Sequence, residues 1–243
     1  MTKLLSISVL LATTLLASGG AKQWSYGGTE GPEFWGELAL KYSMCKDGKH
    51  QSPINITDLT EAEMEPLVLD YKALATEFTN NGHTVQVNFD KGSNLTIDGK
   101  NFELKQFHFH TPSENQIDGK NYHMEVHLVH ASEAGELAVV AVMITEGKSN
   151  QFFKTLVSKI PKKAKDNNDI KDLKINAGDM LPKDKEYYRF SGSLTTPPCS
   201  EGVRWLVHKT PIEASKEELA IFSSIMGKNN RPIQSINSRE VLK

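Results

Sequence analysis

Three histidines on two short, closely spaced segments are the part of this sequence best suited to chemistry. His108 and His110 are two residues apart, and Glu125 and His127 form a second pair about fifteen residues later. Side chains on a β-strand alternate between its faces, so each pair would share one face. Two neighbouring strands would then bring three imidazoles to one point. Three protein ligands with a fourth position left open for water are the ligand number of a catalytic zinc site.

The residues beside these histidines are suitable second partners. A histidine that binds a metal usually donates its other ring N–H to a fixed acceptor. Gln106 lies two residues before His108, and Glu125 lies two residues before His127. His123 would share a face with His127, which makes it the nearest alternative ligand. A histidine on a strand is more often a surface or structural residue, so the pattern alone leaves that interpretation open.

Alternating apolar and polar residues predict β-strands through most of the chain between residues 67 and 144. The predicted strands cover residues 67–71, 75–80, 85–89, 95–97, 103–110, 122–130 and 137–144. Asn81-Gly82 and Asp98-Gly99 are strong turn signals between strands. Residues 133–136 would join the last two strands as a hairpin. Residues 137–144 have no polar face, which predicts a central strand that is covered on both sides.

Helices are predicted at few places. Residues 37–42 favour a short helix, and residues 150–160 have apolar residues at helical spacing up to Pro161. Residues 215–218 form a capping box for a helix that Gly227 ends. The pattern therefore predicts a mainly β, α+β protein with a few short peripheral helices. Residues 162–174 read as a charged connector, and no domain linker or repeat is evident.

The composition and the first residues narrow the classes of function. The 243 residues include 28 Lys and Arg against 30 Asp and Glu, without a basic stripe that would bind nucleic acid. Residues 1–21 have one lysine, an apolar stretch and a run of small residues, which is typical of a cleaved signal peptide. The mature protein would then be periplasmic or secreted, with no membrane segment. A retained N-terminal anchor is the alternative.

The two cysteines fit export from the cytoplasm. An even pair of cysteines in an exported protein suggests a disulfide, here between Cys45 and Cys199. Two buried free thiols are the alternative interpretation.

Five motifs in order resemble the α-class carbonic anhydrases of the secreted bacterial kind. They are Gln51-Ser52-Pro53-Ile54-Asn55, Asn80-Asn81-Gly82-His83, Phe107-His108-Phe109-His110, Glu125-Val126-His127-Leu128-Val129-His130 and Ser193-Leu194-Thr195-Thr196-Pro197-Pro198-Cys199. The resemblance covers about residues 24–239. It implies one catalytic domain over residues 22–243, with a central, largely antiparallel twisted sheet and zinc at the base of a conical cleft. It also favours the disulfide.

The resemblance implies a reaction and roles for individual residues. One Zn²⁺ per chain would be held by His108, His110 and His127, and zinc-bound hydroxide would attack CO2 in its reversible hydration to bicarbonate and a proton. Thr195 would orient the hydroxide by donating its own proton to Glu114, because a hydroxyl can donate only once.

The remaining roles concern proton transfer and the substrate pocket. His83 matches the position of the proton shuttle, since a group with a pKa near neutrality suits that task. Tyr26, Asn81 and Gln86 would hold the intervening waters, although Gln86 stands where many relatives have Asn. Residues matching the substrate-binding wall are Thr196, Val129, Val139, Leu194, Val203 and Trp205. His123, His130 and His208 would be structural.

The resemblance also implies partners and alternatives. Sulfonamides and anions would inhibit at the zinc, and secreted bacterial relatives are often homodimers. A metal-free binding protein of the same family is the first alternative, but such proteins typically lack a zinc-binding histidine. A different zinc hydrolase, such as an esterase, is the second, although neither His-Glu-x-x-His nor Gly-x-Ser-x-Gly occurs. A secreted structural or adhesive β-domain is the third.

Overall fold

The computed structural model describes residues 23–243, so the predicted signal peptide, residues 1–21, lies outside the described part of the chain. The strands are β1 Asn55–Ile56, β2 Leu59–Thr60, β3 Val68–Tyr71, β4 Ala75–Asn80, β5 Val85–Phe89, β6 Ser93–Ile97, β7 Lys100–His110, β8 Gln116–Ile117, β9 Met124–Ala131, β10 Leu137–Glu146, β11 Asn167–Asp169, β12 Tyr187–Ser193, β13 Glu201–His208, β14 Ile212–Ala214 and β15 Val241–Leu242. The α-helices are α1 Trp35–Leu38, α2 Met44–Asp47, α3 Gln151–Lys159 and α4 Lys216–Met226. Short 3-10 helices are η1 Gly28–Glu30, η2 Leu40–Tyr42, η3 Lys171–Leu173 and η4 Ala177–Met180.

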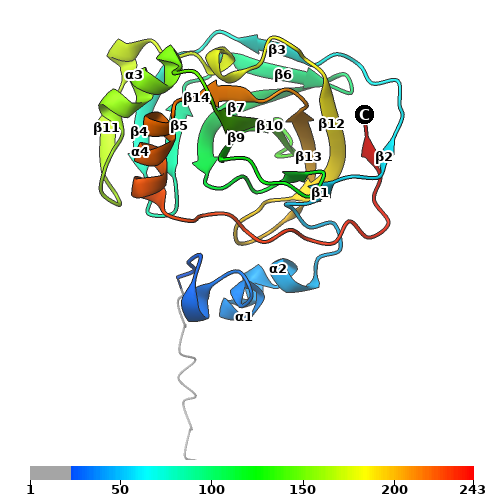
Figure 1. Ribbon diagram of the computed structural model, residues 1–243. Helices are drawn as coiled ribbons and strands as arrows, with labels where there is room; N and C mark the ends of the chain where they lie inside the picture. Colours follow the sequence, from blue (N-terminus) through cyan, green and yellow to red (C-terminus); the bar gives the residue numbers. More distant parts are fainter. Residues whose placement is uncertain (1–22) are drawn as a thin grey trace, which may run out of the picture.

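One large sheet of 13 strands forms the body of the protein (Figure 1). Its main path runs β11-β4-β5-β7-β9-β10-β13-β12-β15-β2, while β1 and β8 form a separate pair. The pairs β10–β13, β10–β14 and β15–β2 are parallel, and the other pairs in the large sheet are antiparallel. The prediction of a largely antiparallel central sheet is confirmed.

Strand β10 is the central strand that its uniformly apolar sequence predicted. It pairs with β9 on one side and with β13 on the other. Ala138, Val140 and Val142 face the larger hydrophobic core, and Val139 and Ala141 face the second one. Each face of the sheet therefore has its own apolar core, and β10 contributes to both because its side chains alternate.

Helices α3 and α4 cover the larger core near β4 and β5 (Figure 1). Asn150 caps α3 by accepting a hydrogen bond from the Phe152 N–H, and Ser215 and Glu218 form the predicted capping box of α4. Gly227 ends α4 at a φ of 62°, a region that favours glycine.

The predictions for two short segments are only partly right. Residues 37–42 are not one helix, because Ala39 is extended and separates α1 from η2. The charged connector contains β11, which pairs with β4, and η3. Strand β11 is the polar run Asn167–Asp169, so no apolar alternation marks it as a strand. Within residues 23–243, none of the helices has the length and apolar character needed to span a membrane.

Candidate metal centre

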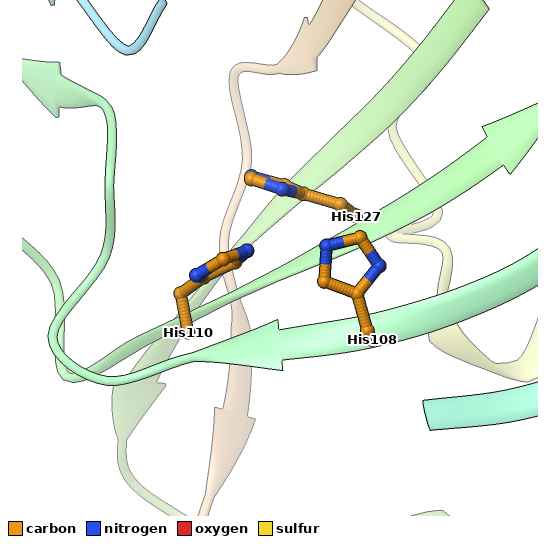
Figure 2. Close-up of side chains that lie close together, drawn as sticks. All are labelled: His108, His110 and His127. Atoms are coloured by element: carbon orange, nitrogen blue, oxygen red, sulfur yellow. The ribbon is translucent and has the colours of Figure 1, made fainter. Parts of the chain in front are cut away.

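Three imidazoles converge on one side of the sheet, at the pairing of β7 with β9 (Figure 2). His108 and His110 project from the same face of β7, and His127 lies directly opposite His108 on β9. The nitrogen atoms available for a metal all lie within 4.8 Å of one another. The two-residue periodicity of a strand and a direct register are therefore sufficient to assemble the triad.

The second ring nitrogen of His108 and that of His110 are both occupied. His108 Nδ1 lies 2.9 Å from Gln106 Oε1, and His110 Nδ1 lies 2.8 Å from the backbone oxygen of Asn229. Each acceptor fixes the proton on Nδ1, so Nε2 keeps its lone pair. His110 Nε2 is buried and has no hydrogen-bond partner among residues 23–243, which suits a metal ligand.

Glu125 lies beside the opposite ring nitrogen of the third histidine. Its Oε1 is 3.0 Å from His127 Nε2, a short polar contact that does not have hydrogen-bond geometry. The Glu125 carboxylate accepts hydrogen bonds from the Glu114 N–H, the Asn115 N–H and the Asn115 side-chain amide at 2.7 to 2.8 Å. With the proton on Nε2, His127 presents Nδ1 to the other two histidines.

The three imidazoles are neutral at neutral pH, as metal ligands must be. Burial is the main cause in each case. It lowers the pKa of His110 to about 4 and lowers the pKa values of His108 and His127 well below their usual range. A set of three neutral, pre-oriented nitrogen donors, two of them on buried residues, fits zinc.

Glu114 lies behind the histidines and is fully buried. Its Oε1 accepts a 2.8 Å hydrogen bond from the Arg231 N–H, and its Oε2 lies 3.4 Å from His110 Nε2. Burial raises the pKa of Glu114 to about 8, against the lowering effect of hydrogen bonds from Arg231 and the Thr195 side chain. A cation bound to the histidines would favour the ionised carboxylate.

The predicted substrate wall lies on the same face of the sheet as the histidines. Val139, Val203 and Trp205 are buried in the second core, with Val129 and Leu194 packed against it. The rings of His127 and Trp205 meet edge-on with centroids 4.8 Å apart. Thr196 is half-buried, and its carbonyl accepts a 2.8 Å hydrogen bond from the Cys199 N–H.

His83 lies on the turn between β4 and β5, at a cavity of about 560 Å³. Tyr26 and Trp24 line the same cavity, and none of the three metal-site histidines does. The His83 ring stacks on Trp24 at 3.7 Å and 11°. Partial burial lowers the pKa of His83, and Gly82 adopts a φ of 90° to make the turn.

The other two residues predicted for the proton path have partners of their own. Asn81 Oδ1 accepts hydrogen bonds from the His83 and Thr84 N–H groups, so only its amide nitrogen is available to water. Gln86 lies opposite His108 in the β5–β7 register and donates a 2.7 Å hydrogen bond to Asn88 Oδ1.

The disulfide between Cys45 and Cys199 is present, as predicted.

His123 lies apart from the triad, since it is half-exposed and accepts a hydrogen bond from the Glu146 N–H. His130 is buried, with Nε2 2.8 Å from the Tyr71 hydroxyl, and His208 is also buried.

Three residues of the site were not identified from the sequence. Asn229 binds His110 through its carbonyl, Arg231 binds Glu114 through its N–H, and Trp24 stacks on His83. Asn229 and Arg231 lie in an irregular polar segment after α4, where no local pattern marks a function. Trp24 lies in an aromatic-rich stretch that is equally typical of simple packing.

Comparison with known proteins identifies close relatives over the whole described chain. The family model for eukaryotic-type carbonic anhydrases matches residues 30–243. A carbonic anhydrase of Pectobacterium carotovorum is 45% identical over 241 residues, which cover 98% of each chain. The structure of the α-carbonic anhydrase of Photobacterium profundum is 51% identical with a TM-score of 0.87, covering 91% of this chain and 100% of that one. The α-carbonic anhydrase of Thermovibrio ammonificans, solved with the inhibitor sulfanilamide, is 45% identical with a TM-score of 0.89, covering 93% and 100%.

Proposed function

This chain belongs to the eukaryotic-type, or α-class, carbonic anhydrase family, and we propose which of its residues carry out the reversible hydration of CO2. Enzymes of this class are zinc-dependent carbonate dehydratases. The observation that carries the proposal is the histidine triad, with His110 and His127 buried and His108 half-buried, whose available nitrogens lie within 4.8 Å of one another.

We assign the zinc ligands as His108 Nε2, His110 Nε2 and His127 Nδ1. In each ring the other nitrogen already faces an acceptor on Gln106, Asn229 or Glu125. Zinc held by three neutral imidazoles keeps its full charge and lowers the pKa of a bound water to near neutrality, as is established for carbonic anhydrases in general.

Thr195 would set which ligands the open zinc position accepts. Its hydroxyl donates its single proton to Glu114, so it offers only lone pairs to the reacting group. The hydrogen-bonding effect of Thr195 on the pKa of Glu114 supports this direction. A ligand that carries a hydrogen is then favoured. Bicarbonate meets this requirement with its O–H, and a sulfonamide that has lost one proton meets it with the N–H that remains.

The apolar wall and His83 would serve the substrate and the released proton. CO2 is uncharged and apolar, so it suits a pocket formed by Val129, Val139, Leu194, Val203 and Trp205, with Thr196 at its polar side. His83 is neutral at pH 7 because burial lowers its pKa, and it is therefore ready to accept a proton. Tyr26, Asn81 and Gln86 are the candidates for holding the water chain between the zinc and His83.

We further propose that residues 1–21 are a cleaved signal peptide and that residues 22–243 form the catalytic domain. The enzyme would then act in the periplasm or outside the cell, where the disulfide between Cys45 and Cys199 is stable. Sulfonamides and small anions would inhibit it. Secreted bacterial relatives suggest a homodimer, which light scattering on the mature protein would test.

Stopped-flow CO2 hydration by the zinc-loaded mature protein between pH 6 and 9 tests the function. We expect a rate that rises with pH around neutrality and is blocked by sulfanilamide. His108→Ala should lose both zinc and activity, and full activity in that variant would refute the ligand assignment. A wild-type rate no greater than that of buffer would favour a metal-free binding relative of the same fold.

A further inference from the structure

A buried cluster behind the metal centre joins segments that are far apart in the sequence. It consists of Gln51, Ser52 and Arg231, which we name the latch. Arg231 is 2% exposed, and Nη1 donates to Gln51 Oε1 at 2.9 Å and to the Ser52 carbonyl at 2.8 Å. Nη2 donates to the Cys45 carbonyl at 2.8 Å. One side chain therefore holds helix α2, which contains Cys45, and the Gln51-Ser52 segment together.

The latch also holds the loop that carries Thr195. Ser52 and Ser193 exchange two hydrogen bonds, N–H to hydroxyl in each direction, at 2.9 and 3.1 Å. Gln51 Nε2 donates to the Cys199 carbonyl at 3.0 Å. The loop is therefore anchored at its start by Ser193 and at its end by Cys199, which is also fixed by the disulfide.

The partner of Thr195 is anchored by the same cluster. The Arg231 N–H donates to Glu114 Oε1, while its guanidinium holds Gln51 and Ser52. The same group of buried hydrogen bonds therefore anchors both Glu114 and the loop that carries Thr195. A shift of the Arg231 backbone would move Glu114 relative to the Thr195 loop.

Stability alone is a poor explanation for this arrangement. The three hydrogen bonds of the guanidinium go to uncharged acceptors. Burying a charged group is costly, and well-packed apolar residues of similar volume often stabilise a core at least as well. Positioning of the residues that touch the reacting group is the function that the geometry supports.

We propose that Arg231 is a positioning residue that, through the latch, aligns Thr195 with Glu114 and so sets the preference of the zinc site for ligands that carry a hydrogen. The inference rests on the proposed roles of Thr195 and Glu114. It gives the Gln51-Ser52 motif a role in ligand selection.

Arg231→Met tests the inference, with Arg239→Met as the matched control. Arg239 is an arginine of the same C-terminal segment whose guanidinium donates to the carbonyls of Ile236, Ser191 and Ser235. Calorimetry on zinc-loaded protein would compare the affinity for sulfanilamide, which offers an N–H, with that for thiocyanate, which carries no hydrogen. We expect the ratio of the two affinities to fall about tenfold or more in Arg231→Met, the value of one hydrogen bond to a charged group. In Arg239→Met the ratio should stay within about twofold of the wild type, well under the tenfold that 1.4 kcal/mol represents.

An unchanged ratio in folded, zinc-loaded Arg231→Met would overturn the inference, as would an equal fall in both variants. If Arg231→Met does not fold, Arg231→Lys replaces it, because it keeps the charge but not the fork that reaches both Cys45 and Gln51. An unchanged ratio in that variant would also overturn it.

Hydrogen exchange of the zinc-free protein separates this inference from the proposed function. The Leu194 and Cys199 N–H groups close the Thr195 loop by bonding to Ser200 and Thr196. Their exchange should accelerate in the Arg231 variant and not in Arg239→Met, whether or not the wild type hydrates CO2. Unchanged protection of both amides would refute the anchoring of the loop.

Discussion

Replacement of Glu125 by Gln tests how the protein fixes the tautomer of His127. Three hydrogen-bond donors surround the Glu125 carboxylate, the Glu114 and Asn115 N–H groups at Oε2 and the Asn115 side-chain amide at Oε1, and His127 Nε2 lies 3.0 Å from Oε1. Gln has only one acceptor oxygen, so its NH2 group must face donors on one side. Both orientations of the new amide therefore have a cost.

The structure indicates which orientation is less costly. With NH2 in the place of Oε2, two buried backbone N–H groups lose their acceptor, at roughly 1–3 kcal/mol each. With NH2 in the place of Oε1, one donor, the Asn115 side-chain amide, loses its acceptor, and His127 can become an acceptor at Nε2, but the proton of His127 then moves to Nδ1. That is the nitrogen needed for zinc. We expect the second orientation and a loss of zinc affinity of about 10- to 100-fold, the usual effect of removing such a partner, or about 1.4–2.7 kcal/mol.

Competition with a chelator at pH 7.5 would measure the zinc affinity, and urea unfolding of the metal-free protein would measure stability. Glu218→Gln is the matched control, because Glu218 is also a buried carboxylate, with hydrogen bonds from Ser149, Asn150 and Ser215 far from the metal centre. It should lower stability and leave zinc affinity unchanged. The reasoning fails if Glu125→Gln loses stability while its zinc affinity stays within about threefold of the wild type, less than the tenfold effect expected of such a partner.

Three further predictions concern the proton path, the disulfide and a buried histidine. His83→Ala should lower kcat at saturating CO2 in dilute buffer, and added imidazole should restore it. In the wild type the His83-dependent rate should reach half its maximum below pH 6.5, because burial lowers the pKa of His83. A rate that is insensitive to the substitution would exclude the shuttle role. Joint replacement of Cys45 and Cys199 by Ser should lower the free energy of unfolding by about 2–5 kcal/mol, since the bridge closes a sequence separation of 154 residues. An unchanged denaturation midpoint would contradict this. Burial lowers the pKa of His208 to about 4. The unfolded chain therefore takes up a proton near pH 6.5 while the folded chain does not, so the free energy of unfolding falls as the pH falls from about 6.5 to about 4. Between pH 7 and 5, metal-free His208→Asn should therefore lose about 2 kcal/mol less stability than the wild type, and equal losses in denaturant titrations would count against the assignment.

The sequence by itself determined the parts of this protein that depend on local periodicity. Alternation along a strand is enough to place His108 with His110, His108 with Gln106 and His127 with Glu125, because the backbone geometry fixes which side chains share a face. The absence of a polar face identified β10 as central. Pro161 predicted the end of α3, and the capping box and Gly227 gave the ends of α4. The five ordered motifs then identified the family, since together they constrain most of the chain.

Only the tertiary structure decided the contacts between distant segments. Arg231 meets Gln51 across 180 positions, and Asn229 meets His110 across 119. Such pairs follow from the path of the chain through the sheet and the loops, and an irregular segment with no periodic pattern carries no local signal of where it will pack. The chemistry of the metal ligands could therefore be read from the sequence, whereas the groups that hold those ligands and the Thr195–Glu114 pair in place became evident only once the chain was folded.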